Sequence, residues 1–267
     1  MGGVRRERLD RLLTLRGQAR SRERAQALIL AGVVRVDGRR TAKAGTLVPV
    51  DAEVTIVAPD HPFVGRGGMK MQGALDAFRV DPEGRVALDI GSSTGGFTDC
   101  LLRRGARTVY ALDVGTGQLD WSLRNDERVV VMEGRNARHL RPEDLPGPVD
   151  IVVVDVSFIS LRLILPVIPP LLRPGGEVLV LVKPQFEVGR REVGRGGIVR
   201  DPRGHLSALR AVAEAASACG LTFRGACPSP IRGAEGNREF FLYLGIDPTR
   251  AVPEPGRIFE RIVDGTE

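Results

Sequence analysis

The chain has 267 residues, of which 42% are apolar, so it can form one large domain or two unequal domains with a proper hydrophobic core. No apolar run approaches the roughly 18 residues that a membrane-spanning helix needs, and the mean hydropathy is −0.06. The three cysteines have neither disulfide-framework nor metal-ligand spacing, so reduced thiols and no metal site are expected. The N-terminal residues contain no apolar signal core, which favours a cytoplasmic location, and a monomer is favoured over an oligomer.

The positive charge is concentrated near the N-terminus. Residues 1–60 hold 12 Lys and Arg against 7 Asp and Glu, which accounts for most of the formal net charge of +6. This asymmetry predicts that a small N-terminal unit meets a polyanion. Only three of the 39 basic residues are lysines: Lys43, Lys70 and Lys183. Because a desolvated lysine can release its proton and an arginine cannot, a lysine in so arginine-rich a chain is a candidate for chemistry.

The first 60 residues predict two short helices and a small sheet. Leucines recur on one face of residues 8–16, and a second amphipathic helix is predicted at 22–31. Residues 33–41 read as a hairpin with an Asp-Gly turn, and 54–57 as a further strand. Arginines occur throughout this region, which indicates contact with RNA phosphates. The alternative is a solvated basic face on a structural module.

A proline-broken stretch at 58–64 indicates a domain boundary. The sequence predicts an N-terminal domain at 1–59, a linker at 60–64 and a larger domain at 65–267. After Gly65-Arg-Gly-Gly-Met-Lys70 a helix is predicted at 71–78, so Lys70 would stand where that helix begins and could face a ligand. The alternative for Lys70 is an ordinary surface lysine.

The larger domain is organised around a glycine-rich turn after a buried strand. The strand is predicted at 86–90, and the following Gly91-Ser-Ser-Thr-Gly-Gly-Phe-Thr98 leads into a helix that extends to residue 104. The spacing is Gly-x-x-x-Gly after Asp89, which differs from the dinucleotide fingerprint and from a P-loop. An acid before such a turn suits a cationic ligand without phosphates, such as S-adenosyl-L-methionine. An ordinary tight strand–helix turn is the alternative.

Strands alternate with helices through the rest of the domain, which predicts an α/β fold with a doubly wound, Rossmann-like sheet. Further strands are expected at 108–113, 129–132, 151–155, 177–183, 221–226 and 239–245. Asp113 ends the second strand, where a carboxylate can meet ribose hydroxyls; a helix cap is the alternative. The segment 134–138, with Asn136, would border an adenine.

The remaining segments include two predicted helices, a long loop and the C-terminal tail. A helix kinked at Pro166 is predicted at 161–172, and a helix at 205–219. The stretch 184–203 reads as a long structureless loop, which we expect to close over RNA. The tail after Asp247 is expected to hold one short helix.

Three polar residues stand at predicted strand ends, namely Asp155, Lys183 and Glu239. Adjacent strands lie about 4.8 Å apart, so such groups can touch. A lysine held among carboxylates has a fixed position, and a buried lysine can serve as a base. Methylation of a ribose 2′-hydroxyl needs that help, because the protonated hydroxyl is a poor nucleophile, and it needs in-line placement of the reacting atoms.

Two parts of the chain resemble known families. Arg8-Leu-Asp-Arg-Leu-Leu and Ser21-Arg-Glu-Arg-Ala-Gln-Ala-Leu-Ile-Leu-Ala-Gly resemble the S4 RNA-binding domain. The motifs Asp89-Ile-Gly-Ser-Ser-Thr-Gly-Gly-Phe-Thr, Asp155-Val-Ser-Phe-Ile-Ser and Val182-Lys-Pro-Gln-Phe-Glu resemble the FtsJ-like (RrmJ-type) RNA 2′-O-methyltransferases. The two together, from Arg5 to Gly245, are similar to the TlyA family of ribosomal-RNA cytidine 2′-O-methyltransferases, whose members also carry the name haemolysin.

The resemblance implies a fold, a cofactor and a set of site residues. It implies a small α+β S4 domain before a methyltransferase sheet that uses S-adenosyl-L-methionine and acts on ribosomal RNA or ribosomal subunits. The catalytic tetrad would be Lys70, Asp155, Lys183 and Glu239, in which Lys183 is the base, Asp155 and Glu239 orient it, and Lys70 steers the hydroxyl. The donor-binding residues would be Asp89, Gly91, Ser92, Ser93, Thr94, Gly95, Gly96, Phe97, Asp113, Val114, Asn136 and Asp155. The RNA-binding residues would be Arg5, Arg6, Arg11, Arg20, Arg22, Arg24, Arg66, Arg190 and Arg191. A catalytically inactive RNA-binding protein and a haemolysin are the alternatives.

Overall fold

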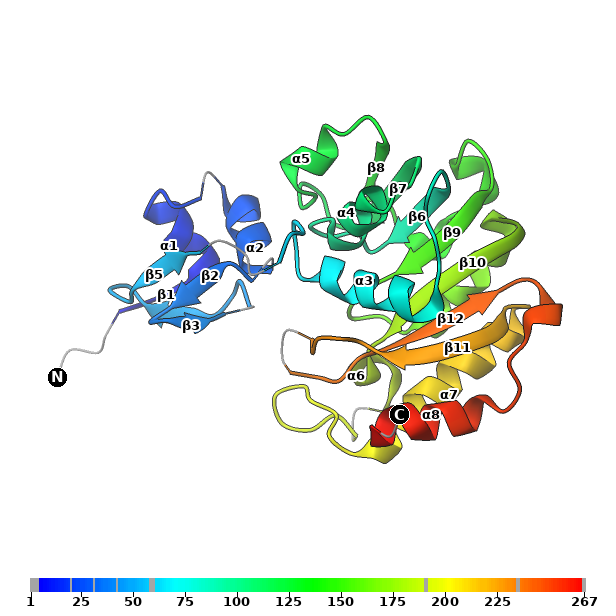
Figure 1. The fold of residues 1–267 in the computed structure, drawn as a ribbon. Helices are drawn as coiled ribbons and strands as arrows, with labels where there is room; N and C mark the ends of the chain where they lie inside the picture. The colour runs from blue at the N-terminus through cyan, green and yellow to red at the C-terminus, as the bar shows by residue number, and fades with distance from the viewer. Residues whose placement is uncertain are drawn as a thin grey trace.

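The computed structural model describes residues 5–19, 21–30, 32–41, 43–57, 61–189, 192–233 and 236–265. A small α+β unit precedes a larger α/β unit (Figure 1). The small unit contains β1 (Arg6–Arg8), α1 (Leu9–Leu15), α2 (Arg22–Leu30), β2 (Val34–Val36), β3 (Arg39–Arg40), β4 (Leu47–Pro49) and β5 (Val54–Ile56).

The small unit has its own core. Apolar side chains of α1 and α2, among them Leu9, Leu13 and Ile29, pack against the strands with almost no exposure. Both predicted helices and the hairpin are confirmed. The sequence missed β1 and β4, which pair with each other and are only three residues long.

A buried carboxylate joins the two helices of the small unit. Asp10, at the start of α1, is fully buried and accepts hydrogen bonds from Arg8, Arg22 and Gln26. The hydrogen bond from Arg8, helped by those from Gln26 and Arg22, holds the pKa of Asp10 well below its ordinary value. Because Arg22 and Gln26 belong to α2, this carboxylate fixes the packing of α1 against α2.

The larger unit is built on one seven-stranded sheet with the order β11-β12-β10-β9-β6-β7-β8. All neighbours are parallel except β12, which runs antiparallel between β10 and β11. The strands are β6 (Val86–Ile90), β7 (Thr108–Asp113), β8 (Val129–Glu133), β9 (Val149–Val154), β10 (Leu172–Val182), β11 (Thr222–Pro228) and β12 (Phe240–Gly245).

Helices cover both faces of this sheet, as a doubly wound fold requires. Along β6, Leu88 and Ile90 point to the face covered by α7 (Pro202–Ala218) and α8 (Pro255–Asp264). Ala87 points to the other face, where α3 (Gly67–Phe78) and α4 (Gly96–Arg103) pack. Figure 1 shows α3 and α4 on the opposite side of the strands from α7 and α8. The predicted α/β class is confirmed.

The segment predicted as one kinked helix at 161–172 is instead a series of single turns. Three 3₁₀-helices span Leu161–Leu163, Leu165–Val167 and Pro169–Leu171. Pro166, Pro169 and Pro170 lack the N–H that an α-helix needs, so the three prolines break the helix rather than bend it. The expectation of a continuous helix was wrong.

The segment predicted as a structureless loop at 184–203 also has more structure than expected. A one-turn helix, α6 (Pro184–Glu187), follows β10, and the carboxylate of Glu187 accepts hydrogen bonds from Ser160 and from the backbone N–H of Leu161. Helix α7 begins three residues earlier than predicted because Asp201 caps it and Pro202 occupies its first position.

Helix α3 likewise begins earlier than predicted, at Gly67, so Lys70 lies in its first turn. The tail contains the expected helix, α8, which buries Phe259 and Val263. No described helix is long and apolar enough to cross a membrane. Within the described ranges, no group of three His, Cys, Asp or Glu side chains is placed to hold a metal ion.

Candidate active site

The polar residues at the strand ends meet at one edge of the sheet. Asp155 directly follows β9 and Lys183 directly follows the parallel neighbour β10. Because β12 runs antiparallel to β10, its beginning lies at the same edge, and the pairing of Val182 with Phe240 brings Glu239 beside Lys183 along the backbone. The order of the strands therefore gathers three of the four predicted catalytic residues.

Lys183 is held by two oxygen atoms. Its ammonium nitrogen lies 2.5 Å from Oδ1 of Asp155, and it donates a hydrogen bond of 2.9 Å to Oγ of Ser157. Both charged side chains are largely buried, with 11% of Lys183 and 18% of Asp155 exposed. The position of Nζ is thus fixed from two sides.

Lys70 reaches the same cluster from α3 and forms the second ion pair. Its Nζ lies 2.6 Å from Oε2 of Glu239, and the two side chains are 11% and 3% exposed. Burial alone would lower the pKa of Lys70, but the charges of Asp155 and Glu239 outweigh it and raise this pKa. Lys70 is therefore a fixed positive charge.

The carboxylate of Asp155 interacts with the positive charges of both lysines. Burial would raise the pKa of its carboxyl group, whereas the positive charges of Lys183 and Lys70 lower it below its ordinary value. Asp155 is therefore an ionised carboxylate at neutral pH. A carboxylate that stays charged can hold a lysine in place throughout a reaction.

The structure brings the four predicted catalytic residues together as two ion pairs. The sequence placed both Asp155 and Glu239 around Lys183; the side chain of Glu239 forms its ion pair with Lys70 instead. Ser157, which the sequence did not single out, takes the second position on Lys183. Its place two residues beyond Asp155 in the strand-end motif was the available signal.

The glycine-rich turn passes close to this cluster. Gly91 has a φ of +86°, and a Cβ on it would lie 2.4 Å from the backbone oxygen of Asp155. Gly95, at a φ of +96°, has the side chains of Leu119 and Leu123 where its Cβ would be. Any side chain at either position would therefore collide with its neighbours, in a conformation that already favours glycine.

Two buried oxygen atoms of this turn have no hydrogen-bond partner among the described residues. They are Oδ1 of Asp89 and Oγ of Ser92. The other oxygen of Asp89 accepts a hydrogen bond of 2.7 Å from Thr98, another residue that the sequence reasoning did not assign. Burial, only partly offset by that hydrogen bond, raises the pKa of Asp89 to about 7. Buried polar atoms of this kind are expected to meet a ligand or water.

Asp113 lies at the end of β7, as the sequence predicted, but its carboxylate already accepts hydrogen bonds from backbone N–H groups. Its oxygens accept hydrogen bonds from the N–H groups of Ser93 and Gly115, at 2.8 and 2.7 Å. This carboxylate therefore ties the end of β7 to the glycine-rich turn. Each oxygen keeps a lone pair with which it could bind a ribose hydroxyl.

The other predicted donor residues differ in environment. Val114 is 73% exposed, and Asn136 caps the 3₁₀-helix Ala137–His139. Phe97 is 3% exposed and packs against Phe241 in the core, so its side chain supports the turn from below. Gly96 approaches the backbone of α3, and Thr94 lies against Gly65, so the turn and the start of α3 are in contact.

An exposed aromatic side chain directly follows Ser157 in the chain. Phe158, next to Ser157, is 92% exposed and has a φ of +64°, a region that a bulky residue occupies only at a cost of roughly 1–3 kcal/mol. Its ring lies 5.2 Å from the ring of Phe186, three residues after Lys183. The two rings form an aromatic pair on the segments that follow Asp155 and Lys183, which the sequence did not predict.

The predicted RNA-binding arginines lie mostly on the surface of the small unit. Those described and exposed are Arg5, Arg6, Arg11, Arg22 and Arg24. Arg24 of α2 forms an ion pair of 3.2 Å with Asp120, the cap of α5 (Trp121–Arg124). Arg66 is half-buried and donates to the backbone oxygen of Arg232. Arg20, Arg190 and Arg191 lie outside the described residues.

Comparisons with known proteins agree with this architecture. A family model described as FtsJ-like methyltransferase matches residues 63–246, and a model of the S4 domain matches residues 7–54. The chain belongs to the TlyA family of FtsJ-like methyltransferases. It is therefore a methyltransferase, as the sequence predicted.

Individual relatives within the TlyA family are similar over nearly their whole length. The chain is 48% identical to 16S/23S rRNA (cytidine-2′-O)-methyltransferase TlyA of Mycobacterium tuberculosis, over 95% of each protein. It is 42% identical to Hemolysin A of Brachyspira hyodysenteriae, over 89% of this chain and 99% of that one. A solved structure from Streptococcus thermophilus, assigned to the hemolysins, superposes with a TM-score of 0.76 at 40% identity and covers 99% of this chain and 96% of its own.

Proposed function

We propose that this protein transfers a methyl group from S-adenosyl-L-methionine to a ribose 2′-hydroxyl of ribosomal RNA. The observation that carries the proposal is the fixed Lys183, paired with Asp155 and Ser157 at the sheet edge next to the glycine-rich turn. The TlyA relatives named as cytidine-2′-O-methyltransferases favour a cytidine as the target.

The glycine-rich turn fits the methyl donor. Gly91 carries no side chain because it packs closely against the backbone of Asp155, so the turn itself adds little bulk there. The unpartnered oxygens of Asp89 and Ser92 offer hydrogen-bond acceptors to the donor. The donor would be held by these residues together with Ser93, Thr94, Gly95, Gly96, Phe97, Asp113, Val114, Asn136 and Asp155. When bound, S-adenosyl-L-methionine supplies a methyl group activated on a sulfonium.

Lys183 would accept the proton of the attacking hydroxyl. As the C–O bond forms and the C–S bond breaks, the hydroxyl proton moves to Nζ of Lys183, which must be neutral at that moment. A neutral amine that donates one hydrogen to Ser157 and lies beside the carboxylate of Asp155 could present its lone pair to the substrate. The pair of oxygen partners therefore orients the base as well as holding it.

Lys70 would act as a fixed cation rather than as a second base. The pKa of Lys70 is raised, so it remains charged, and its ion pair with Glu239 fixes its place. A fixed ammonium near the reacting oxygen favours the developing negative charge on that oxygen and can orient the hydroxyl by donating a hydrogen bond. Holding both partners in place is itself a large part of the catalysis.

The small unit would bring in the RNA. We place the division into domains at 1–59 and 65–267, with 60–64 as the linker. The S4 match and the exposed arginines of this unit support a role in docking ribosomal RNA or ribosomal subunits in the cytoplasm.

The direct test is methyl transfer from labelled S-adenosyl-L-methionine to isolated ribosomal subunits, followed by mapping of 2′-O-methyl groups. One or a few cytidines should become methylated in an enzyme-dependent manner. Donor binding without transfer to any ribosomal RNA would favour an inactive RNA-binding protein and overturn the proposal. Calorimetry with S-adenosyl-L-methionine separates these outcomes from failure of the donor site itself.

A further inference from the structure

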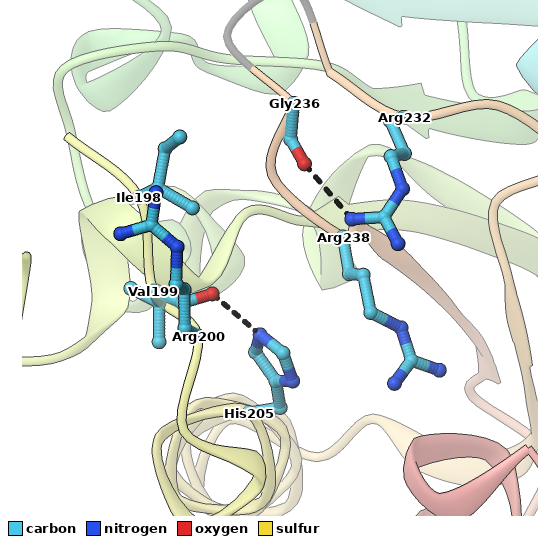
Figure 2. A pocket seen from close by; sticks show the side chains of 7 residues that line it. All are labelled: Ile198, Val199, Arg200, His205, Arg232, Gly236 and Arg238. Atoms are coloured by element: carbon cyan, nitrogen blue, oxygen red, sulfur yellow. Dashed lines mark hydrogen bonds between the residues drawn. The ribbon is translucent and has the colours of Figure 1, made fainter. Parts of the chain in front are cut away.

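A cavity lies outside the catalytic cluster. It has a volume of about 370 Å³, within the range of small-molecule sites. Its walls come from the segment before α7, from the first turns of α7 and from the connection between β11 and β12. Figure 2 shows the seven lining residues, Ile198, Val199, Arg200, His205, Arg232, Gly236 and Arg238. None of the tetrad or of the proposed donor-binding residues lines it.

The described lining of the cavity is positively charged. Three of its lining residues are arginines, and within the described part of the chain no carboxylate forms an ion pair with any of them. Arg238 is tied down, because it donates to the backbone oxygens of Val263 and Ile262 at the end of α8. Arg232 donates to the oxygen of Gly236, and its other N–H groups meet no acceptor among the described residues. Arg200 is exposed at the rim. The cavity therefore offers an anion at least two guanidinium groups.

The buried His205 sets a second requirement for a ligand of this cavity. It is 3% exposed, and its Nε2 lies 3.0 Å from the backbone oxygen of Val199. A carbonyl oxygen only accepts, so Nε2 carries the hydrogen. Burial, together with the positive charges of Arg238 and Arg232, lowers the pKa of the ring against the opposing effects of the Val199 carbonyl and Asp201. The ring is thus neutral at physiological pH, and Nδ1 is an acceptor.

This acceptor has no partner. Nδ1 of His205 is buried and makes no hydrogen bond within the described residues. In Figure 2 it lies on the edge of the ring that faces Arg238, away from the hydrogen bond to Val199. A ligand that satisfies the whole cavity must therefore carry a negative group for the arginines and, close to it, a hydroxyl or amine that donates to Nδ1.

One repeating unit of RNA meets both requirements. A ribonucleotide has a phosphate and a neighbouring 2′-hydroxyl, whereas DNA has the phosphate alone. Resting on the proposed function, we propose that this cavity holds a ribose–phosphate unit of the substrate RNA strand. Its phosphate lies between Arg200 and Arg232, and its 2′-hydroxyl donates to Nδ1 of His205. The cavity is then a second strand contact in the larger unit that distinguishes RNA from DNA.

The cavity is linked to the catalytic cluster through the chain. Asn237, 1% exposed, accepts a hydrogen bond from the N–H of Val199 and donates to the oxygen of Gly197. This side chain fixes both walls of the cavity, and Arg238 directly precedes Glu239 of the tetrad. A strand bound here would therefore be held on the same segment that carries a catalytic residue.

The nitrogen signals of histidine provide a direct test with the full chain. Only three histidines are present, so the Nδ1 resonance of His205 can be assigned by comparison with His205→Phe. A short single-stranded oligoribonucleotide should shift this resonance in the direction expected for an acceptor that gains a hydrogen bond, and the oligodeoxyribonucleotide of the same sequence should not. An equal response to DNA, or to inorganic phosphate alone, would mean a general anion site and overturn the proposal.

Measurements of RNA binding provide a second test of the cavity assignment. Arg232→Gln should weaken binding of the oligoribonucleotide about fivefold at low salt and reduce the salt-dependence slope by roughly 0.7. The matched control is Arg210→Gln, which removes an exposed arginine of α7 whose partner is Glu260 and which does not line the cavity. Equal affinities for Arg232→Gln and the control would contradict the proposal. If wild-type protein methylates ribosomal RNA while these two arms fail, only the cavity assignment is wrong; absence of methylation rejects the proposed function instead.

Discussion

The buried pair of Lys70 and Glu239 offers a quantitative test of the catalytic cluster. Glu239→Gln keeps the shape of the side chain but removes its charge, which leaves the ammonium of Lys70 buried without its nearest partner. At the observed separation of 2.6 Å and an effective dielectric constant of about 20, the direct attraction is about 6 kcal/mol, part of which desolvation offsets.

We expect Glu239→Gln to lower the free energy of unfolding by about 3 kcal/mol. Breaking a buried pair typically costs about 3–5 kcal/mol, and the lower end applies because the carboxylate of Asp155 still acts on Lys70. The loss corresponds to a fall of about 6–12 °C in Tm. Urea unfolding followed by circular dichroism measures it, and Glu260→Gln, which breaks the exposed pair with Arg210, should cost less than about 1 kcal/mol.

A double-mutant cycle decides whether the two residues act as a unit. Lys70→Met should also destabilise the protein, because it strands the carboxylate of Glu239, but Lys70→Met combined with Glu239→Gln removes both charges. The double variant should therefore be more stable than the sum of the single losses predicts, by at least about 2 kcal/mol. Additive losses would refute the argument that each charge is buried only because of the other.

Three further predictions follow from the geometry. Asp89 has a pKa of about 7 in the folded protein, above its unfolded value, so the folded state binds this proton more tightly and the free energy of unfolding falls as pH rises through about 7. Between about pH 5 and about pH 8 the wild type should lose about 3 kcal/mol more of this free energy than Asp89→Asn does, as measured by urea titration. Equal losses in the two proteins would contradict the assignment. Asp120→Ala should weaken donor binding severalfold by calorimetry, because it removes the side-chain cap of α5 and so loosens the backbone whose N–H at residue 120 donates to Thr94 of the glycine-rich turn. Arg24→Ala should leave donor binding unchanged without RNA, and the reverse ranking would reject this reasoning. Phe158→Ala should lower kcat/KM for methyl transfer about 10- to 100-fold with donor affinity unchanged, because the exposed ring can stack on a base, and an unchanged kcat/KM would rule out that contact.

The fold and the location of the site were predictable because they depend on local patterns. Short apolar runs ending in a polar residue identify strands, and the ends of parallel strands share one edge, so Asp155 and Lys183 could be expected to meet. The glycines of the donor turn were readable for the same reason. Their spacing is set by close contacts and by the positive φ angles of Gly91 and Gly95, which favour glycine.

The pairing within the site was not predictable, because it depends on tertiary structure. The side-chain partner of Glu239 is decided by the antiparallel insertion of β12 and by the early start of α3, which brings Lys70 from a helix rather than from a loop. Ser157 acts through a turn that follows the strand, and no periodic pattern marks it. The cavity around His205 joins segments about 30 residues apart, beyond the reach of any local signal.

The most direct measurement of the central claim compares Lys183→Ala and Lys183→Arg with the wild type in methyl transfer to ribosomal RNA and in donor binding. Arginine keeps the positive charge but does not release its proton, so both variants should lose transfer by roughly 100-fold or more while binding S-adenosyl-L-methionine within about twofold of the wild type. Transfer by either variant at close to the wild-type rate would contradict the role of Lys183 as the base.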